Sequence, residues 1–294
     1  MTASPSSWRR NTSPPVSDIR EAPLTDLFRI RDHVADFDAL VADILARSAA
    51  TCARLPMIAD VATGPGPGDA VDIFRPEGSA SGLPVHMFIH GGYWRMFSKR
   101  DYACIADTVT AAGAIAVIVD YTLMPSVRMV TLVDQVRRAR DWVRDNIEGH
   151  GGDPTRISVS GHSAGAHLAS FLFTADQAPS GLRAALLLGG LYELEPLRSS
   201  FLQAEIGLTD QEVAAFTPLT QRHAPGPRIE ITLGADETAP FHSQAADFAD
   251  HLTRQGLQVT RSALAARNHM TSVRDLAIPG TEAGRLLTDL IRTA

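Results

Sequence analysis

The sequence has few cysteines and no long hydrophobic run among its 294 residues. Only Cys52 and Cys104 are present, which is too few for a disulfide framework and too far apart for a Cys-x-x-Cys metal knuckle. No stretch approaches the roughly 20 apolar residues that a membrane span requires. Arg9 and Arg10 are not followed by an apolar run, which argues against a cleavable secretory signal. We therefore expect a cytoplasmic protein with no membrane partner.

Positive charge is also scarce. The 27 basic residues are outnumbered by 33 acidic ones, which gives a formal charge of -6. Such a chain offers nothing that attracts a phosphate backbone, so no nucleic-acid partner is expected. Hydrophobic residues make up 45% and charged residues 20% of the chain, as in ordinary globular domains. The composition therefore predicts a soluble folded protein rather than a disordered or fibrous one.

The chain divides into a short N-terminal arm and one large domain. Proline, serine and threonine are frequent near the N-terminus, and residues 1–34 are expected to form a mobile arm. Residues 35–294 show no repeat and no internal break in composition, which predicts a single domain. Within it, residues 191–227 are irregularly patterned and are expected to form a loop region or a small helical lid.

Hydrophobic periodicity predicts alternating strands and helices. Apolar residues recur at helical spacing in residues 36–55, 132–147 and 286–291. Short apolar runs bounded by turn residues predict strands at 57–61, 71–74, 85–90, 114–121, 157–161, 182–188, 228–234 and 259–265. The alternation predicts an α/β fold with a mostly parallel, twisted sheet and helices on both faces. Ligands of such sheets bind at the carboxyl edge of the strands.

The first motif with chemical meaning is Gly161-His162-Ser163-Ala164-Gly165. It follows a predicted strand and precedes an apolar stretch suited to a helix, which is the context of a nucleophile elbow. The tight turn strains the serine, and glycines two residues to either side let the neighbouring backbones pass. Average glycine usage produces the pattern by chance in about one chain in ten of this length. Ser163 is therefore the candidate nucleophile, and a second motif is needed to support the assignment.

The second motif, His90-Gly91-Gly92-Tyr93-Trp94, follows another predicted strand. In acyl transfer the carbonyl oxygen becomes an oxyanion, which preorganised N–H donors must stabilise. We expect Gly92 and Tyr93 to supply one or two donors and Ala164 to supply another. The rings of Tyr93 and Trp94 would then crowd the reacting carbonyl and favour a small acyl group. In the alternative interpretation, the motif is an ordinary turn and both rings only pack.

An acid and a histidine complete this chemistry when they follow the serine in that order. Asp236 and Glu237 follow the predicted strand at 228–234, and His269 follows the next strand. His269 would take the proton of Ser163, while the acid fixes the tautomer of the histidine. Glu237 is favoured because it gives a longer strand-to-acid loop, and Asp236 remains the alternative.

No metal or other cofactor is expected. His162 and His167 are five residues apart, which does not place two imidazoles on one helical face, and no His-Glu-x-x-His pattern occurs. The glycine-rich residues 64–68 include two prolines, which lack the N–H groups that a phosphate cradle needs. His90 is expected to anchor the oxyanion loop through a hydrogen bond.

HGGYW at 90–94 and GHSAGAHLA at 161–169 together resemble the α/β-hydrolase superfamily. Within it, they are similar to the kynurenine formamidase (arylformamidase) branch, a neighbour of the hormone-sensitive-lipase-like esterases. The resemblance implies a catalytic triad of Ser163, His269 and either Glu237 or Asp236. It also implies an oxyanion loop made of Gly91, Gly92 and Tyr93. Met270 departs from the family pattern, in which an aromatic residue is expected after the histidine.

The resemblance implies a metal-independent serine hydrolase that works through an acyl-enzyme. Its expected partner is a small-molecule substrate, an aryl amide or ester that carries a formyl or small acyl group. A general short-chain carboxylesterase is the alternative. A non-catalytic ligand receptor on a hydrolase fold is disfavoured, because no triad member is missing. The sequence is compatible with a homodimer and does not fix the oligomeric state.

Overall fold

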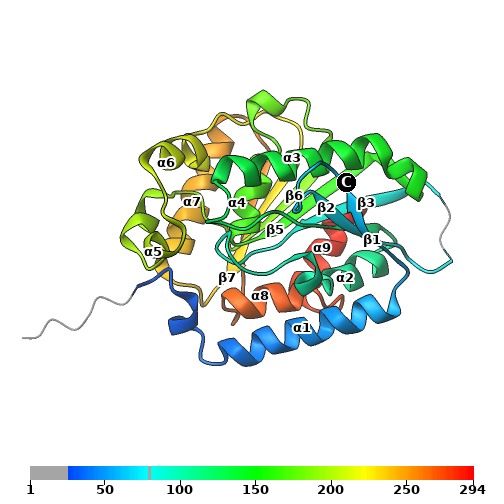
Figure 1. Cartoon of the computed structure of the whole chain (residues 1–294), viewed down its shortest axis with the longest axis horizontal. Helices are drawn as coiled ribbons and strands as arrows, with labels where there is room; N and C mark the ends of the chain where they lie inside the picture. The colour runs from blue at the N-terminus through cyan, green and yellow to red at the C-terminus, as the bar shows by residue number, and fades with distance from the viewer. Residues whose placement is uncertain (1–25, 79–80) are drawn as a thin grey trace, which may run out of the picture.

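The computed structural model describes residues 26–78 and 81–294, and one mixed sheet dominates it (Figure 1). Its strands are β1 (Met57–Ala62), β2 (Ala70–Phe74), β3 (Leu83–Ile89), β4 (Ile115–Val119), β5 (Gly152–His162), β6 (Leu182–Leu188), β7 (Arg228–Gly234) and β8 (Val259–Leu264). The strand order is β1-β2-β4-β3-β5-β6-β7-β8. β2 pairs antiparallel with β1 and β4, and the other neighbours are parallel. The predicted, mostly parallel sheet is confirmed.

Helices cover both faces of this sheet (Figure 1). On one face lie α1 (Phe37–Arg54), α2 (Ile105–Ala111), α8 (His269–Leu276) and α9 (Glu282–Arg292), which contact one another. On the other face lie α3 (Met129–Asn146), α4 (Ala164–Ser170) and α7 (Ala239–Arg254). The predicted helices at 36–55, 132–147 and 286–291 correspond to α1, α3 and α9. In the described part of the chain, no helix is long and apolar enough to cross a membrane.

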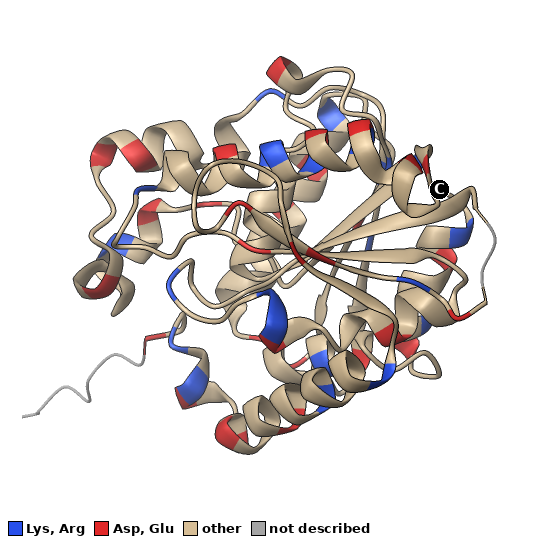
Figure 2. Ribbon diagram, turned by 45° about the vertical axis from the view of Figure 1, so that its right-hand side comes forward, with Lys and Arg blue, Asp and Glu red and all other residues tan. Residues whose placement is uncertain are grey.

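The two helical layers explain the apolar character of the central strands. Every residue of β4 is buried, because helices exclude water from both faces of a parallel sheet. Charged residues lie mostly on the surrounding helices and loops (Figure 2). The hydrophobic core is therefore centred on the sheet, and we expect the functional polar side chains at the strand ends.

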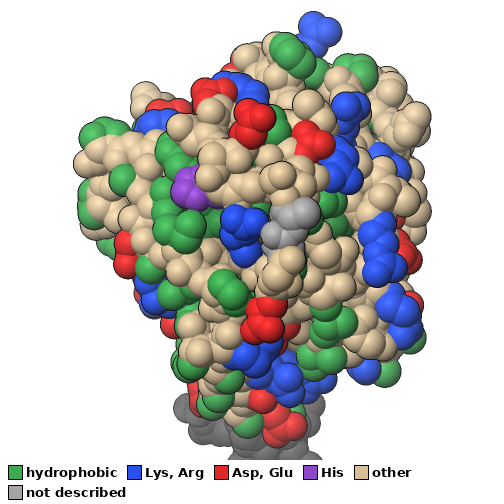
Figure 3. All heavy atoms as spheres, turned by 90° about the vertical axis from the view of Figure 1, so that its right-hand side faces the viewer, with side chains coloured by type: hydrophobic (Ala, Val, Ile, Leu, Met, Phe, Trp, Pro, Cys, Tyr) green, Lys and Arg blue, Asp and Glu red, His purple; other side chains and the backbone are tan. Residues whose placement is uncertain are grey.

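The carboxyl ends of the parallel strands point toward α5 (Leu202–Ile206) and α6 (Asp210–Phe216), on the left of Figure 1. These two short helices lie in the region 191–227, together with two 3₁₀ turns. The amino end of β3 lies at the opposite end of the molecule. Figure 3 views that end, where basic, acidic and hydrophobic side chains are interspersed.

The last part of the predicted N-terminal arm belongs to the domain. Residues 1–25 lie outside the described residues, whereas residues 26–34 pack onto the domain. Phe28, Ile30 and Val34 are buried, and residues 30–33 form a 3₁₀ turn. The prediction that the arm extends to residue 34 is therefore wrong for its last part, because these apolar side chains find partners in the domain.

Candidate active site

Ser163 stands at a strained turn between β5 and α4. Its φ is 55° and its ψ is -120°, a conformation that L-residues rarely adopt. A Cβ on Gly161 would lie 2.3 Å from the carbonyl oxygen of Gly165, and a Cβ on Gly165 would lie 2.1 Å from that of Ile89. Only glycine fits at these two positions. The turn has the geometry of the nucleophile elbow that the sequence predicted.

The loop after β7 and the start of α8 bring an acid and a histidine together at the same sheet edge. Nδ1 of His269 lies 2.7 Å from Oε2 of Glu237, whose side chain is fully buried. The other carboxylate oxygen accepts the N–H of Gly234 at 2.9 Å. Because a carboxylate can only accept, the neutral ring of His269 carries its proton on Nδ1 and keeps a lone pair on Nε2.

The structure also separates the two candidate acids. Asp236 is exposed, and its main-chain N–H donates to the carbonyl oxygen of Arg267 at 2.9 Å. Glu237 instead turns inward to His269. The alternative assignment of Asp236 as the acid partner is therefore wrong, because consecutive side chains of this loop point in different directions.

His269 occupies the first position of α8 rather than a loop. Asn268 caps the helix, and its Oδ1 accepts the N–H groups of Met270 at 3.1 Å and of Thr271 at 2.9 Å. Such a cap fixes the start of the helix and so the direction in which His269 points. The sequence analysis predicted that His269 lies in the loop after β8, whereas the residue is the first of α8.

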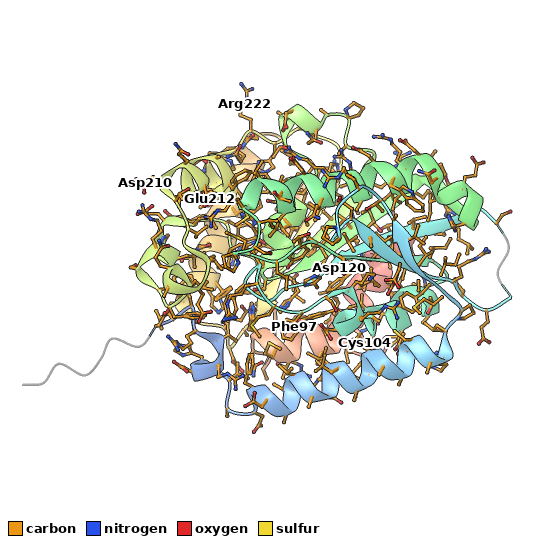
Figure 4. All side chains as sticks on the ribbon, in the orientation of Figure 1. Phe97, Cys104, Asp120, Asp210, Glu212 and Arg222 are labelled. Atoms are coloured by element: carbon orange, nitrogen blue, oxygen red, sulfur yellow. The ribbon has the colours of Figure 1, made fainter. Side chains whose placement is uncertain are left out.

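A cavity of about 30 Å³ brings the candidate residues together. Ser163, His269, Gly92 and Tyr93 line it with Ile30, Phe37, Met96, Phe97 (labelled in Figure 4), Tyr102, His162 and Met270. Within the described residues, no hydrogen bond engages the Ser163 hydroxyl or Nε2 of His269. Both groups are therefore available to a molecule in the cavity.

The loop after β3 supplies candidate oxyanion donors. Gly92 has a φ of 111°, and a Cβ there would lie 2.4 Å from the carbonyl oxygen of Met96. Gly91 passes close to the elbow, since a Cβ on it would lie 3.2 Å from Cβ of Ser163. In residues 26–78 and 81–294, no hydrogen bond occupies the N–H groups of Gly92, Tyr93 or Ala164. Ala164 begins α4, where unpaired N–H groups attract negative charge.

The side chain of His90 anchors this loop. Its Nδ1 donates to the carbonyl oxygen of Gly91 at 2.8 Å, and its ring stacks on Tyr121 at 4.2 Å. The predicted anchoring hydrogen bond is confirmed. Nε2 of His90 faces Asp120 (labelled in Figure 4) at 3.5 Å, and Nζ of Lys99, the only lysine of the sequence, lies 3.6 Å from that carboxylate. Burial opposes ionisation of Asp120, but His90 and Lys99 leave its pKa below the ordinary value.

Trp94 does not take the position predicted for it. Its side chain is fully buried, and Nε1 donates to Nδ1 of His167 at 3.2 Å. Its ring packs edge-on against that of His167 in α4, with centroids 5.0 Å apart. The prediction that Trp94 crowds the substrate is therefore wrong, whereas Tyr93 does line the cavity.

His162 is a cavity residue that the sequence analysis did not assign to the site. Its Nε2 donates to the carbonyl oxygen of His269 at 3.0 Å, and the two ring centroids are 4.5 Å apart. Burial, reinforced by His269, holds the pKa of His162 well below its ordinary value, so the ring is neutral. Its place beside Ser163 in the elbow motif was the available signal.

Residues 86–274, which include Ser163, Glu237 and His269, match the model of a protein family described as alpha/beta hydrolase fold. The chain belongs to this family.

In the described part of the chain, no group of three or more His, Cys, Asp or Glu side chains could hold a metal ion.

Individual relatives point to one branch of the family. Kynurenine formamidase of Danio rerio is 27% identical over 79% of this chain and 80% of its own length. Esterase LipQ of Mycobacterium tuberculosis is 37% identical over 38% of this chain and 27% of its own. A solved structure from Silicibacter shares the fold, with a TM-score of 0.79 and 20% identity over 92% of this chain and all of that one. The resemblance to the arylformamidase and esterase branch is confirmed.

Proposed function

We propose that the protein is a serine hydrolase that removes a formyl or other small acyl group from an aryl amide or ester. The observation that carries the proposal is the small cavity lined by Ser163 and His269. Its volume is small, about 30 Å³. A small cavity favours a formyl or acetyl group over a long acyl chain.

The geometry supports an acyl-enzyme mechanism. Nε2 of His269 takes the hydroxyl proton of Ser163 while Oγ attacks the carbonyl carbon. The N–H groups of Gly92, Tyr93 and Ala164 donate to the resulting oxyanion. His269 then protonates the leaving nitrogen or oxygen, and the acyl-enzyme remains.

The second half of the reaction uses the same groups. His269 removes a proton from water, which attacks the acyl carbon. The bond to Oγ of Ser163 then breaks as His269 returns the proton to Oγ, and the free acid leaves. Glu237 stabilises the imidazolium that forms in each half, because its carboxylate faces Nδ1. No step requires a metal ion.

The relatives support two substrate classes. Those named kynurenine formamidase favour an aryl formamide, and those named esterase favour a short-chain carboxylic ester as the second candidate. A receptor without activity is disfavoured because serine, histidine and acid are all in place. A cytoplasmic location is supported by Cys52 and Cys104, which are both free thiols.

The test is a parallel assay of the purified protein on N-formylkynurenine, p-nitrophenyl acetate and p-nitrophenyl octanoate. We expect turnover of the formyl and acetyl substrates, with kcat/KM on the octanoate lower by about tenfold or more. Faster formamide than acetate hydrolysis selects the formamidase, and the reverse selects the esterase. An optimum on the octanoate contradicts a small-acyl enzyme.

A further inference from the structure

The N-terminal segment, residues 26–34, forms a wall of the cavity at Ser163. Ile30 lines that cavity, whereas its neighbours Arg29 and Arg31 line an outer cavity of about 290 Å³. Phe37, Tyr93 and Met96 line both cavities and so stand between them. In Figure 1 the segment is the dark blue stretch that precedes α1, near α5. The segment therefore contributes to the lining of both cavities.

The hydroxyl of Tyr93 fastens the segment to the oxyanion loop. It donates to the carbonyl oxygen of Phe28 at 2.9 Å and accepts the N–H of Ile30 at 3.0 Å. The ring meets Phe201 edge-on, with centroids 5.2 Å apart. Burial raises the pKa of Tyr93 well above its ordinary value, so the hydroxyl keeps its proton and can make both bonds. The side chain of one oxyanion-loop residue thus holds Ile30 in place.

Two further hydrogen bonds hold the segment elsewhere. Oγ1 of Thr238 donates to the carbonyl oxygen of Leu27 at 2.7 Å, and Thr238 directly follows Glu237. A carboxylate oxygen of Asp26 accepts the N–H of Phe201 at 2.6 Å. The segment therefore connects the oxyanion loop with the loop that carries the acid. A connection to both loops places it at the mouth of the site rather than at a distant surface.

We propose that Tyr93 determines substrate specificity: its hydroxyl holds Ile30 against the inner cavity and thereby limits the length of the acyl group that is accepted. This inference rests on the proposed function, because it requires acyl transfer at Ser163. Loss of the hydroxyl breaks two hydrogen bonds and leaves the ring and the main-chain N–H in place. Ile30 then moves outward more easily, and a longer acyl chain reaches the outer cavity.

The experiment compares kcat/KM of the wild type and Tyr93→Phe on p-nitrophenyl acetate, butyrate and octanoate. We expect the acetate-to-octanoate ratio to fall by about tenfold, mainly through faster octanoate hydrolysis. Thr238→Val removes the tie to Leu27 and is expected to lower the ratio less. Ser243→Ala is the matched control, because among the residues that the structure describes its hydroxyl donates only to the carbonyl oxygen of Pro240 in the same helix, at 3.1 Å. Its ratio stays at the wild-type value.

The chain-length ratio separates a specificity role from a merely structural one. An unchanged ratio in folded Tyr93→Phe overturns the inference, and so does an equal loss on all three esters. If Tyr93→Phe does not fold, Thr238→Val and Asp26→Ala, each of which removes one side-chain hydrogen bond of the segment, decide the question by the same ratio. Failure of the proposed function is seen in the wild type, as absence of ester and formamide turnover, and overturns both. Failure of this inference alone is seen only in the variants.

Discussion

Nδ1 of His269 and Oε2 of Glu237 lie 2.7 Å apart beside Gly189, which leaves no room for a side chain. A Cβ on Gly189 would lie 3.0 Å from Oε1 of Glu237 and 3.1 Å from Nδ1 of His269, and the glycine has a φ of 53°. The pair is therefore enclosed by backbone as well as by burial. Enclosure of this kind keeps water from competing with the contact between the ring and the carboxylate.

Glu237→Gln is expected to lower kcat by about 10³- to 10⁴-fold, because the amide no longer selects the productive tautomer of His269 or stabilises its charged form. Steady-state kinetics on the preferred substrate measures the effect. Asp236→Asn is the matched control, since the exposed Asp236 side chain does not contact His269, and its kcat should stay near that of the wild type. The reverse ranking of the two variants would return the role to Asp236.

Trp94→Ala is expected to destabilise the protein by about 3–5 kcal/mol, because it empties a fully buried site and leaves His167 without its donor. Urea denaturation gives the free energy of unfolding, and an ester series gives the chain-length preference. That preference should not change, since Trp94 does not line the cavity. A flattened chain-length profile with normal stability would place the ring at the acyl group after all.

Gly165→Ala tests the packing of the elbow. The added methyl would lie 2.1 Å from the carbonyl oxygen of Ile89, so the backbone of β3 or of α4 has to move. We expect loss of most of the activity together with lower thermal stability, because the shift also displaces Ser163. Wild-type activity in this variant would show that the backbone crossing is looser than the structure indicates.

Three buried histidines make stability depend on pH. Burial lowers the pKa of His86 to about 3 and those of His167 and His223 to about 4. The ring nitrogens of His86 lie 2.8 Å and 2.7 Å from the hydroxyls of Ser158 and Ser160, which suits a neutral ring. Below about pH 6.5, the ordinary histidine pKa, these three residues therefore bind protons in the unfolded chain and stay neutral in the folded protein.

The contribution of these histidines to the free energy of unfolding should consequently be complete above about pH 6.5 and fall as the pH decreases toward 4. Each of the three groups contributes a slope of up to about 1.4 kcal/mol per pH unit. Urea denaturation at neutral pH and at about pH 5 measures the difference. Equal stability at the two pH values would contradict the description of these histidines as neutral and buried.

Local pattern was enough to predict most of the sheet. Strands at 182–188 and 228–234 coincide with β6 and β7, because apolar runs bounded by turn residues are typical of strands covered on both faces. The elbow was equally readable, since the steric need for glycine at 161 and 165 is a property of the turn itself. The order Ser, acid, His likewise follows from the fold.

Side-chain direction at the site could not be read in the same way. Glu237 and Asp236 are adjacent, and only the path of the backbone after β7 decides which one turns inward. Trp94 was misplaced because its ring packs against His167 of α4, a residue far away in the sequence. The packing of residues 26–34 depends on partners such as Tyr93 and Phe201, which lie far away in the sequence. Each of these features is set by tertiary contacts rather than by local preference.

The mechanism requires that Ser163 becomes covalently acylated. Diethyl p-nitrophenyl phosphate transfers its diethylphosphoryl group to an activated serine and releases p-nitrophenol. Intact-mass spectrometry with peptide mapping should find one such group per chain, on Ser163, with activity lost in proportion, and should find none on Ser163→Ala. A group on another residue, or full activity in Ser163→Ala, would show that Ser163 is not the nucleophile.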